Sequence, residues 1–430
     1  MENQENEKPT PFFQTTTARM IMVGLLTLFL LIPLSYVGNL ITERSLRQQE
    51  VISETSKKWG ESVYFYGPIV RIPYKDVLTQ KTNFAYFFPE ELNNSTKTTI
   101  AEPLQRSIYK SNVFKTEMQF TGNYSSPDFS SKNIPNENIY WNRASIIIKT
   151  CNLQSLKDEV KIKFGTANLT FEPVHLNSSN DSIESLETSL FDYNLIKSNS
   201  NFKLNFNCNG SKQIKIIPIG KTTIAKMTSN WNSPNFNGNQ IPISKTITTN
   251  GFTANWKILH FNRPFAQHHF ENLPDLKNYG FAVDFITPVD DYQQNERAAK
   301  YGFLVIGLTF LIFFLIQSIS KINIHIFQYS MIGLALVMFY TLLISITEHS
   351  SFSFAYAIAG SSVVVLISLY SISILKNRKF PAFIGISLTT LYLFIYVIIQ
   401  LEDYALLVGS IGLFLILSAV MYFSRKIDWK

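Results

Sequence analysis

Six long apolar stretches constrain this chain more than any other feature of its sequence. They lie at about Met20–Leu40, Tyr301–Ile319, Phe327–Thr347, Ser353–Leu375, Pro381–Gln400 and Tyr404–Phe423. A helix needs about 20 mostly apolar residues to cross the hydrocarbon core of a bilayer. The sequence therefore predicts an integral membrane protein, with one transmembrane helix near its N-terminus and five near its C-terminus.

The first apolar stretch could instead be a cleaved secretory signal peptide. Pro33 and Ser35 fall where a cleavage region would lie, but no A-x-A pattern follows them. The apolar segment is also longer than that of a typical signal peptide. A membrane anchor is therefore the favoured interpretation.

The charges between the spans predict the orientation. With the N-terminus in the cytoplasm, the short outer loops contain no Lys or Arg, and the inner segments carry Lys321, Lys376, Arg378, Lys379, Arg425, Lys426 and Lys430. This asymmetry is the positive-inside pattern. It accounts for much of the net charge of +7, and without a basic stripe interleaved with aromatics we expect no nucleic-acid partner. We expect a periplasmic segment between the first two spans and two cytoplasmic termini.

The predicted organisation has five parts. They are a cytoplasmic tail (1–19), a first transmembrane helix (20–40), a periplasmic β-rich domain with helical stalks (41–300), a bundle of five transmembrane helices (301–423) and a second cytoplasmic tail (424–430). The polar segment Glu43–Lys58 contains no Gly or Pro and would extend the first helix as one stalk. Thr287-Pro288-Val289-Asp290 is typical of a helix N-terminus and predicts a second stalk that runs into the second span.

The large outer segment alternates with the period of two that is typical of strands. Apolar residues alternate with polar ones over Phe114–Thr121 and Phe252–Ile258, and Ile146–Ile148 predicts a strand buried on both faces. Turn-forming residues separate such runs, at Asn93-Asn94, Gly122-Asn123, Asn209-Gly210, Asn237-Gly238-Asn239 and Asn250-Gly251. Many short strands with polar turns predict a sandwich-like all-β domain. The polar tract Asn177–Asn201 is expected to be an exposed excursion.

Few residues offer recognisable chemistry. The sequence has no G-x-S-x-G, H-E-x-x-H, P-loop or G-x-G-x-x-G arrangement. His260, His268, His269 and Glu271 lie close together in the sequence, but adjacent histidines on a strand point to opposite faces. We therefore expect surface histidines, with neither a metal nor a cofactor.

Glu348-His349 is the main candidate pair, because it ends the third span at the outer membrane interface, where ionisable residues invite a functional interpretation. An acid–base pair or proton relay is one interpretation, and a solvated loop is the alternative. The interiors of the spans after the first hold no Asp, Glu, Lys or Arg, which argues against ion-coupled transport but not against a path for neutral lipids.

Small residues line one span, and two cysteines lie in the outer segment. The small residues Ala355, Ala357, Ala359, Gly360, Ser361 and Ser362 favour close helix packing, with a substrate path as the alternative. Cys151 and Cys208 would permit one disulfide in an oxidising compartment, and a buried free thiol is the alternative for Cys208.

Several stretches resemble one family of bacterial membrane proteins. They are Gly67–Pro73, Met227–Trp231, Gly251–Trp256, Pro288–Gln293, Glu296–Tyr301, Leu336–Tyr340, Glu348-His349 and Arg425–Trp429. In this order they are similar to the inner-membrane CreD family, also called cell envelope integrity protein CreD. The resemblance implies a role in envelope integrity and stress response under a two-component regulon. It implies no catalytic residues, since the family's molecular activity is not established.

Three functions stay open at the sequence level. The first is a non-enzymatic envelope protein that binds an envelope component or protein through its periplasmic domain, with the bilayer around its helices. The second is a lipid-moving or channel-like bundle, suggested by the five clustered spans. The third is a membrane-interface enzyme that uses Glu348 and His349, for which the sequence supplies no accompanying nucleophile or metal set.

Overall fold

The computed structural model describes residues 16–102, 104–106, 109–151, 153–174, 183–195, 200–285, 291–320, 322–375, 379–401 and 404–425. The chain divides into two compact units. The helical unit comprises Met1–Gln49 and Val289–Lys430, and the β unit comprises Glu50–Pro288. Each unit is described by itself below.

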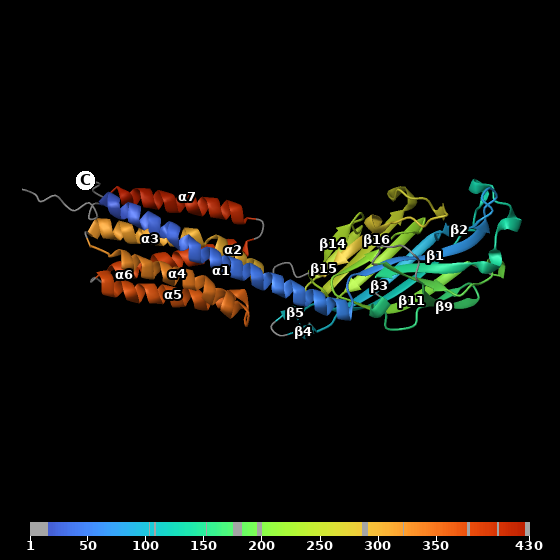
Figure 1. Cartoon of the computed structure of the whole chain (residues 1–430), viewed down its shortest axis with the longest axis horizontal. Helices are drawn as coiled ribbons and strands as arrows, with labels where there is room; N and C mark the ends of the chain where they lie inside the picture. The colour runs from blue at the N-terminus through green and yellow to red at the C-terminus, as the bar shows by residue number, and fades with distance from the viewer. Residues whose placement is uncertain are drawn as a thin grey trace, which may run out of the picture. The chain divides into compact units, whose positions relative to one another are not determined.

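The helical unit contains most of a long N-terminal helix and six further helices (Figure 1). They are α1 (Thr16–Trp59), α2 (Asp291–Lys300), α3 (Gly302–Ser320), α4 (Ile326–Thr347), α5 (Phe352–Leu375), α6 (Lys379–Gln400) and α7 (Ala405–Ser424). All except α2 are long and apolar enough to cross a membrane. The predicted arrangement of one N-terminal and five C-terminal spans is confirmed, and the segment Glu43–Lys58 is helical as expected.

Small residues bring the apolar helices close together. A Cβ atom at Gly333 of α4 would lie 2.1 Å from the Leu30 side chain of α1, and one at Gly302 of α3 would lie 2.8 Å from Leu34. On α5, Ala355 and Ala359 are fully buried, whereas Ala357, Ser361 and Ser362 are exposed, so only part of the predicted small surface packs against other helices. Close approach of this kind is the usual basis of helix association in membranes, where apolar burial gives little driving force.

Helix α2 is not the second stalk that the sequence suggested. It belongs to the helical unit, and it ends at Lys300 before α3 begins at Gly302. Its Asn295 is fully buried, and its Arg297 guanidinium lies 3.5 Å from the backbone oxygen of Ile399 at the end of α6. The helix packs across the ends of its neighbours because its polar side chains find partners there. The predicted N-cap at Thr287–Asp290 lies outside the described residues.

The β unit is built from two sheets. Sheet A has the order β14 (Asn235–Gly238), β18 (Phe281–Asp284), β12 (Gln213–Ile216), β1 (Val63–Lys75), β7 (Ser145–Cys151), β10 (Ile183–Thr188) and β9 (Ala167–Val174), with β2 (Thr82–Phe87) and β17 (His268–Phe270) branching from β1. Sheet B has the order β8 (Lys161–Phe164), β11 (Asn201–Gly210), β6 (Phe114–Asn123), β3 (Glu91–Ile100), β13 (Thr222–Ser229), β16 (Gly251–Leu259) and β15 (Ser244–Thr248).

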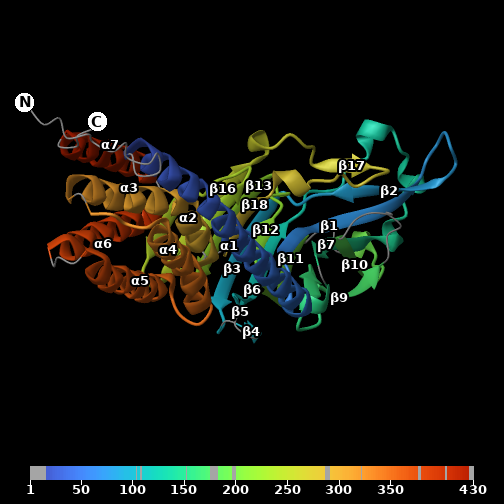
Figure 2. The same cartoon turned by 60° about the vertical axis from the view of Figure 1, so that its left-hand side comes forward.

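Most neighbouring strands in the two sheets are antiparallel, but β1–β12 and β3–β13 are parallel pairs. The β8–β9 pairing joins sheet A to sheet B. The short strands β4 (Leu104–Arg106) and β5 (Tyr109–Ser111) form a separate hairpin. Figure 2 shows β2 and β17 running together beside β1 in the β unit.

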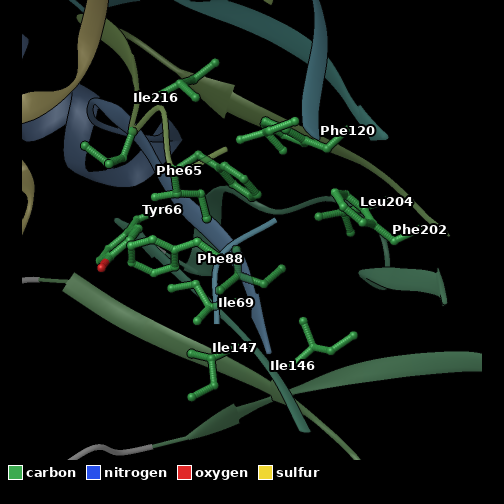
Figure 3. Packing of buried hydrophobic residues seen from close by; sticks show 14 of the residues in the cluster. Phe65, Tyr66, Ile69, Phe88, Phe120, Ile146, Ile147, Phe202, Leu204 and Ile216 are labelled. Carbon is green, nitrogen blue, oxygen red and sulfur yellow. The ribbon is translucent and has the colours of Figure 1, made fainter. Parts of the chain in front are cut away.

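One apolar core lies between the two sheets (Figure 3). Phe65 of β1 stacks on Phe120 of β6 with 4.0 Å between ring centroids, so side chains of both sheets interdigitate. On β6 the apolar side chains of Phe114, Met118 and Phe120 are buried. The alternation seen in the sequence is therefore the inside–outside alternation of a sandwich, and this prediction is confirmed.

Several local predictions are wrong. The predicted turn pairs Gly122-Asn123, Asn209-Gly210 and Asn237-Gly238 are paired with neighbouring strands in the last residues of β6, β11 and β14. Asn93-Asn94 is not a turn but lies inside β3, where the buried Asn94 side chain donates a hydrogen bond to the Gln119 backbone oxygen over 3.4 Å. The tract Asn177–Asn201 is not entirely an excursion, because Ile183–Thr188 forms β10 between β7 and β9. In all these places pairing with neighbouring strands overrides a polar local sequence.

Candidate functional site

Glu348 and His349 follow the last residue of α4. The Glu348 carboxylate lies 3.6 Å from the Arg44 guanidinium on α1, and the Glu348 side chain is 17% exposed. The His349 side chain is exposed, and its backbone N–H donates to Ile346. Glu348 is therefore paired with a cation from another helix, in an arrangement that ties α1 to α4.

The surrounding polar groups are also engaged within the helical unit. The Asp291 carboxylate accepts a hydrogen bond of 3.1 Å from the Phe352 backbone N–H, which satisfies an otherwise unpaired donor at the start of α5. The Thr347 hydroxyl lies 3.5 Å from the amide oxygen of the buried Asn295. We refer to Arg44, Asp291, Asn295, Thr347 and Glu348 as the polar cap. Its internal contacts suit a structural clamp better than an acid–base site.

A second polar feature lies on the outer face of sheet B. It is a hollow of about 380 Å³, here called the threonine hollow, formed where β3, β13, β15 and β16 end. Its lining residues are mostly hydroxyl and amide side chains: Lys97, Thr98, Thr99, Thr228, Ser229, Asn230, Thr246, Thr248, Asn250, Gly251, Phe252 and Thr253. Strand register brings these side chains together from sequence positions that lie far apart.

A single row of paired residues crosses the threonine hollow. Thr246 lies opposite Thr253, Thr253 opposite Thr228, and Thr228 opposite Lys97. Neighbouring strands are about 4.8 Å apart, so their outward side chains repeat at that spacing. The row therefore presents three hydroxyls and one ammonium group at regular intervals across the sheet.

The backbone at the edge of the threonine hollow is held in place by specific contacts. The Asn230 side chain accepts a 2.7 Å hydrogen bond from the Ile100 backbone N–H, which ties the end of β3 to the end of β13. Gly251 has φ +139°, and a Cβ atom there would lie 2.0 Å from the Ser229 oxygen. Only glycine fits that turn, which confirms the predicted turn at Asn250-Gly251.

Two stretches that carry the family resemblance meet at the threonine hollow. Met227–Trp231 supplies one wall, and Gly251–Trp256 supplies the other. Sequence analysis did not identify this site, because threonines on strands are unremarkable singly and the pairing of β13 with β16 is not visible in either stretch. The sequence offered one indication of this site, namely that both stretches are polar and both carry the family resemblance.

The other candidate residues of the β unit lie elsewhere. Cys208 is a buried free thiol, and burial raises its pKa to about 12. The side chain of Cys151 lies outside the described residues. His269 is partly buried, with its Nε2 3.2 Å from the Ala266 oxygen. Within the described ranges, no group of three or more His, Cys, Asp and Glu residues could hold a metal.

Solved structures resemble the chain only weakly. A Legionella pneumophila protein described as nutrient-binding has a TM-score of 0.29 and 8% identity, over 57% of this chain and 79% of that one. An M1 zinc metallopeptidase variant from Deinococcus radiodurans has a TM-score of 0.20 and 9% identity, over 46% of this chain and 42% of that one. Likeness at this level supports no inference about fold or function.

The sequence comparisons are much more specific. The family model described as inner membrane protein CreD matches residues 15–430. Inner membrane protein CreD of Escherichia coli (strain K12) is 26% identical over 419 residues, which cover 94% of this chain and 91% of that protein. The match spans both units and includes all six apolar helices. The chain therefore belongs to the CreD family of multi-pass inner membrane proteins.

Proposed function

We propose that this inner membrane protein supports cell envelope integrity by binding a polysaccharide of the envelope at the threonine hollow. The observation that carries the proposal is the row of Thr246, Thr253, Thr228 and Lys97 across four strands. Hydroxyls both donate and accept hydrogen bonds, as sugar hydroxyls do. A regular row on a sheet face suits an extended polymer better than a compact small molecule.

The accessibility of the polar side chains at the two candidate sites supports the threonine hollow as the binding surface. The polar cap uses its carboxylates on Arg44 and on the start of α5. By contrast, Thr246 and Thr248 in the threonine hollow are exposed, and Thr228 and Thr253 are partly so. Binding needs accessible groups on a rigid support, and the strands around the threonine hollow provide one.

The charge pattern supports the location that this function requires. The segments assigned to the cytoplasm carry the cations, and the short loops assigned to the periplasm contain no Lys or Arg. In this orientation both termini are cytoplasmic and the β unit lies in the periplasm. The threonine hollow would then face the compartment that contains the cell wall.

Co-sedimentation of the detergent-solubilised full chain with purified peptidoglycan sacculi tests the proposal. Replacing Thr228 and Thr253 by Val keeps β-branched shape and removes two hydroxyls. Each lost hydrogen bond weakens binding by about 0.5–1.5 kcal/mol, so the double variant should bind about 5-fold to 150-fold more weakly. Thr222→Val is the matched control, because Thr222 lies on β13 outside the threonine hollow.

The outcomes separate clearly. Weaker binding by the double variant, with wild-type binding by the Thr222→Val control, supports the threonine hollow as the binding surface. Sedimentation that is equal with and without sacculi would contradict the choice of ligand. Binding that the Thr228→Val, Thr253→Val double variant does not weaken would place the contact elsewhere on the β unit.

A further inference from the structure

A large apolar groove lies between three helices of the bundle. It has a volume of about 1000 Å³ and is lined by α3, α6 and α7, with Leu308, Ile316, Phe383, Phe394 and Ile411 among its apolar side chains. The polar side chains of Ser387, Thr390 and Lys379 also line it. Apolar cavities do not hold water stably, so a groove of this size at membrane depth requires an apolar occupant.

Helix α7 is the most exposed wall of this groove. Within the apolar window of α7, no residue is buried, whereas half of the corresponding window of α3 is buried. Figures 1 and 2 both show α7 at the margin of the helical unit. One wall of the groove is therefore a helix that makes few protein contacts of its own, and an occupant would supply the packing it lacks.

The groove is longer than one leaflet along α6 but shorter than the whole hydrocarbon core of a bilayer. It extends from Lys379 to Phe394 along α6 and from Leu308 to Ile319 along α3. At 1.5 Å per residue these distances are about 22 Å and about 16 Å. The hydrocarbon core is about 30 Å thick, so each leaflet contributes about 15 Å. A partner helix would need a groove through the whole core, whereas an acyl chain needs only one leaflet.

Charge distinguishes the two ends of the groove. Lys379 lines the end where α6 begins and where α3 and α7 end. The sequence places further cations beside these same helix ends, at Lys321, Lys376, Arg378, Arg425 and Lys426. An anionic headgroup would be stabilised at this end, because basic side chains near the bilayer surface attract anionic lipids.

We infer that the α3–α6–α7 groove is a binding site for an anionic phospholipid. Its acyl chains lie along the apolar lining, and its phosphate lies at Lys379. The site is separate from the threonine hollow and does not depend on the proposed envelope ligand. The lipid completes the packing of α7 against α3 and α6.

Native mass spectrometry of the full chain tests this inference. The detergent-purified protein is offered equal amounts of phosphatidylglycerol and phosphatidylethanolamine, and the retained lipids are counted. We expect about fivefold preference for phosphatidylglycerol, the effect of one lysine near one anionic headgroup. Lys379→Gln should remove the preference. Lys300→Gln should retain it, since that change removes an equal charge from an exposed residue beside the other end of α3 that does not line the groove.

A second pair of variants tests the groove itself. Ala419 lines the groove on α7, and Leu417 on the same helix is exposed but does not line it. Ala419→Trp should reduce retention of both lipids severalfold, and Leu417→Trp should not. Equal retention of the two lipids that Lys379→Gln leaves unchanged would overturn the inference. So would a dimer that Ala419→Trp dissociates, because the occupant would then be a second copy of the chain.

Discussion

The pairing of Arg44 with Glu348 predicts a measurable coupling energy between α1 and α4. Two unit charges 3.6 Å apart attract by roughly 1 kcal/mol in water and roughly 5 kcal/mol at an effective dielectric constant of 20. The Arg44 side chain is 46% exposed, which places the pair near the screened limit. Exposed ion pairs contribute about 0.2–1 kcal/mol. We therefore expect a coupling of about 1 kcal/mol or less.

A double-mutant cycle measures this coupling. The free energy of unfolding is determined by SDS titration in mixed micelles for the wild type, Arg44→Gln, Glu348→Gln and the double variant. Each single change should cost about as much as both together. The exchanged pair, Arg44→Glu with Glu348→Arg, should recover much of the loss, and His349→Ala should have no effect. If the two single-variant losses of unfolding free energy add up to the loss of the double variant, there is no coupling. That result would refute the polar cap as a structural clamp and make Glu348 a candidate for acid–base chemistry again.

Four further predictions concern the β unit. Glu187→Gln should destabilise the β unit by about 3 kcal/mol in chemical unfolding, because it strands the largely buried Arg71 without its carboxylate; wild-type stability would contradict this. Burial lowers the pKa of His269, so the folded chain binds its proton less tightly than the unfolded chain. Stability should therefore fall as the pH drops through about 6.5, and His269→Gln should flatten that fall, whereas an unchanged pH profile would refute the assignment. Gly251→Ala should lower the melting temperature, because its φ of +139° disfavours any side chain, and an unchanged melting temperature would refute that strain. Cys208 should react with a maleimide only after unfolding, since it is 2% exposed, and rapid labelling of the native chain would exclude its burial.

Composition and periodicity were sufficient to predict the general architecture. The apolar stretches predicted the six spans because each one is long and apolar enough to cross the hydrocarbon core of a bilayer as a helix. The alternation over Phe114–Thr121 predicted β6 correctly because one face of that strand meets the core. In both cases the pattern lies within one short segment of the sequence, and it determines directly which side chains of that segment are apolar and leave water.

The missed features depend on partners that are distant in the sequence. Asn94 appeared to be a turn residue, but strand pairing on both sides, a hydrogen bond to the Gln119 backbone oxygen and one from the Thr96 hydroxyl explain why it is buried in a strand. The polar helix α2 appeared to be a stalk because nothing local indicates that Asn295 lies beside Thr347. The threonine hollow likewise requires the register of four strands. These features arise from tertiary pairing, which a single sequence does not display.

Complementation of a deletion strain under detergent and β-lactam challenge tests the central claim most directly. The Thr228→Val, Thr253→Val double variant is compared with a Glu348→Gln, His349→Ala double variant, at matched membrane levels. The proposed function predicts that the threonine-hollow variant fails to rescue growth, while the Glu348/His349 variant rescues it fully. Rescue by the threonine-hollow variant together with failure of the Glu348/His349 variant would contradict the account and place the activity at the end of the helical bundle where α4 ends.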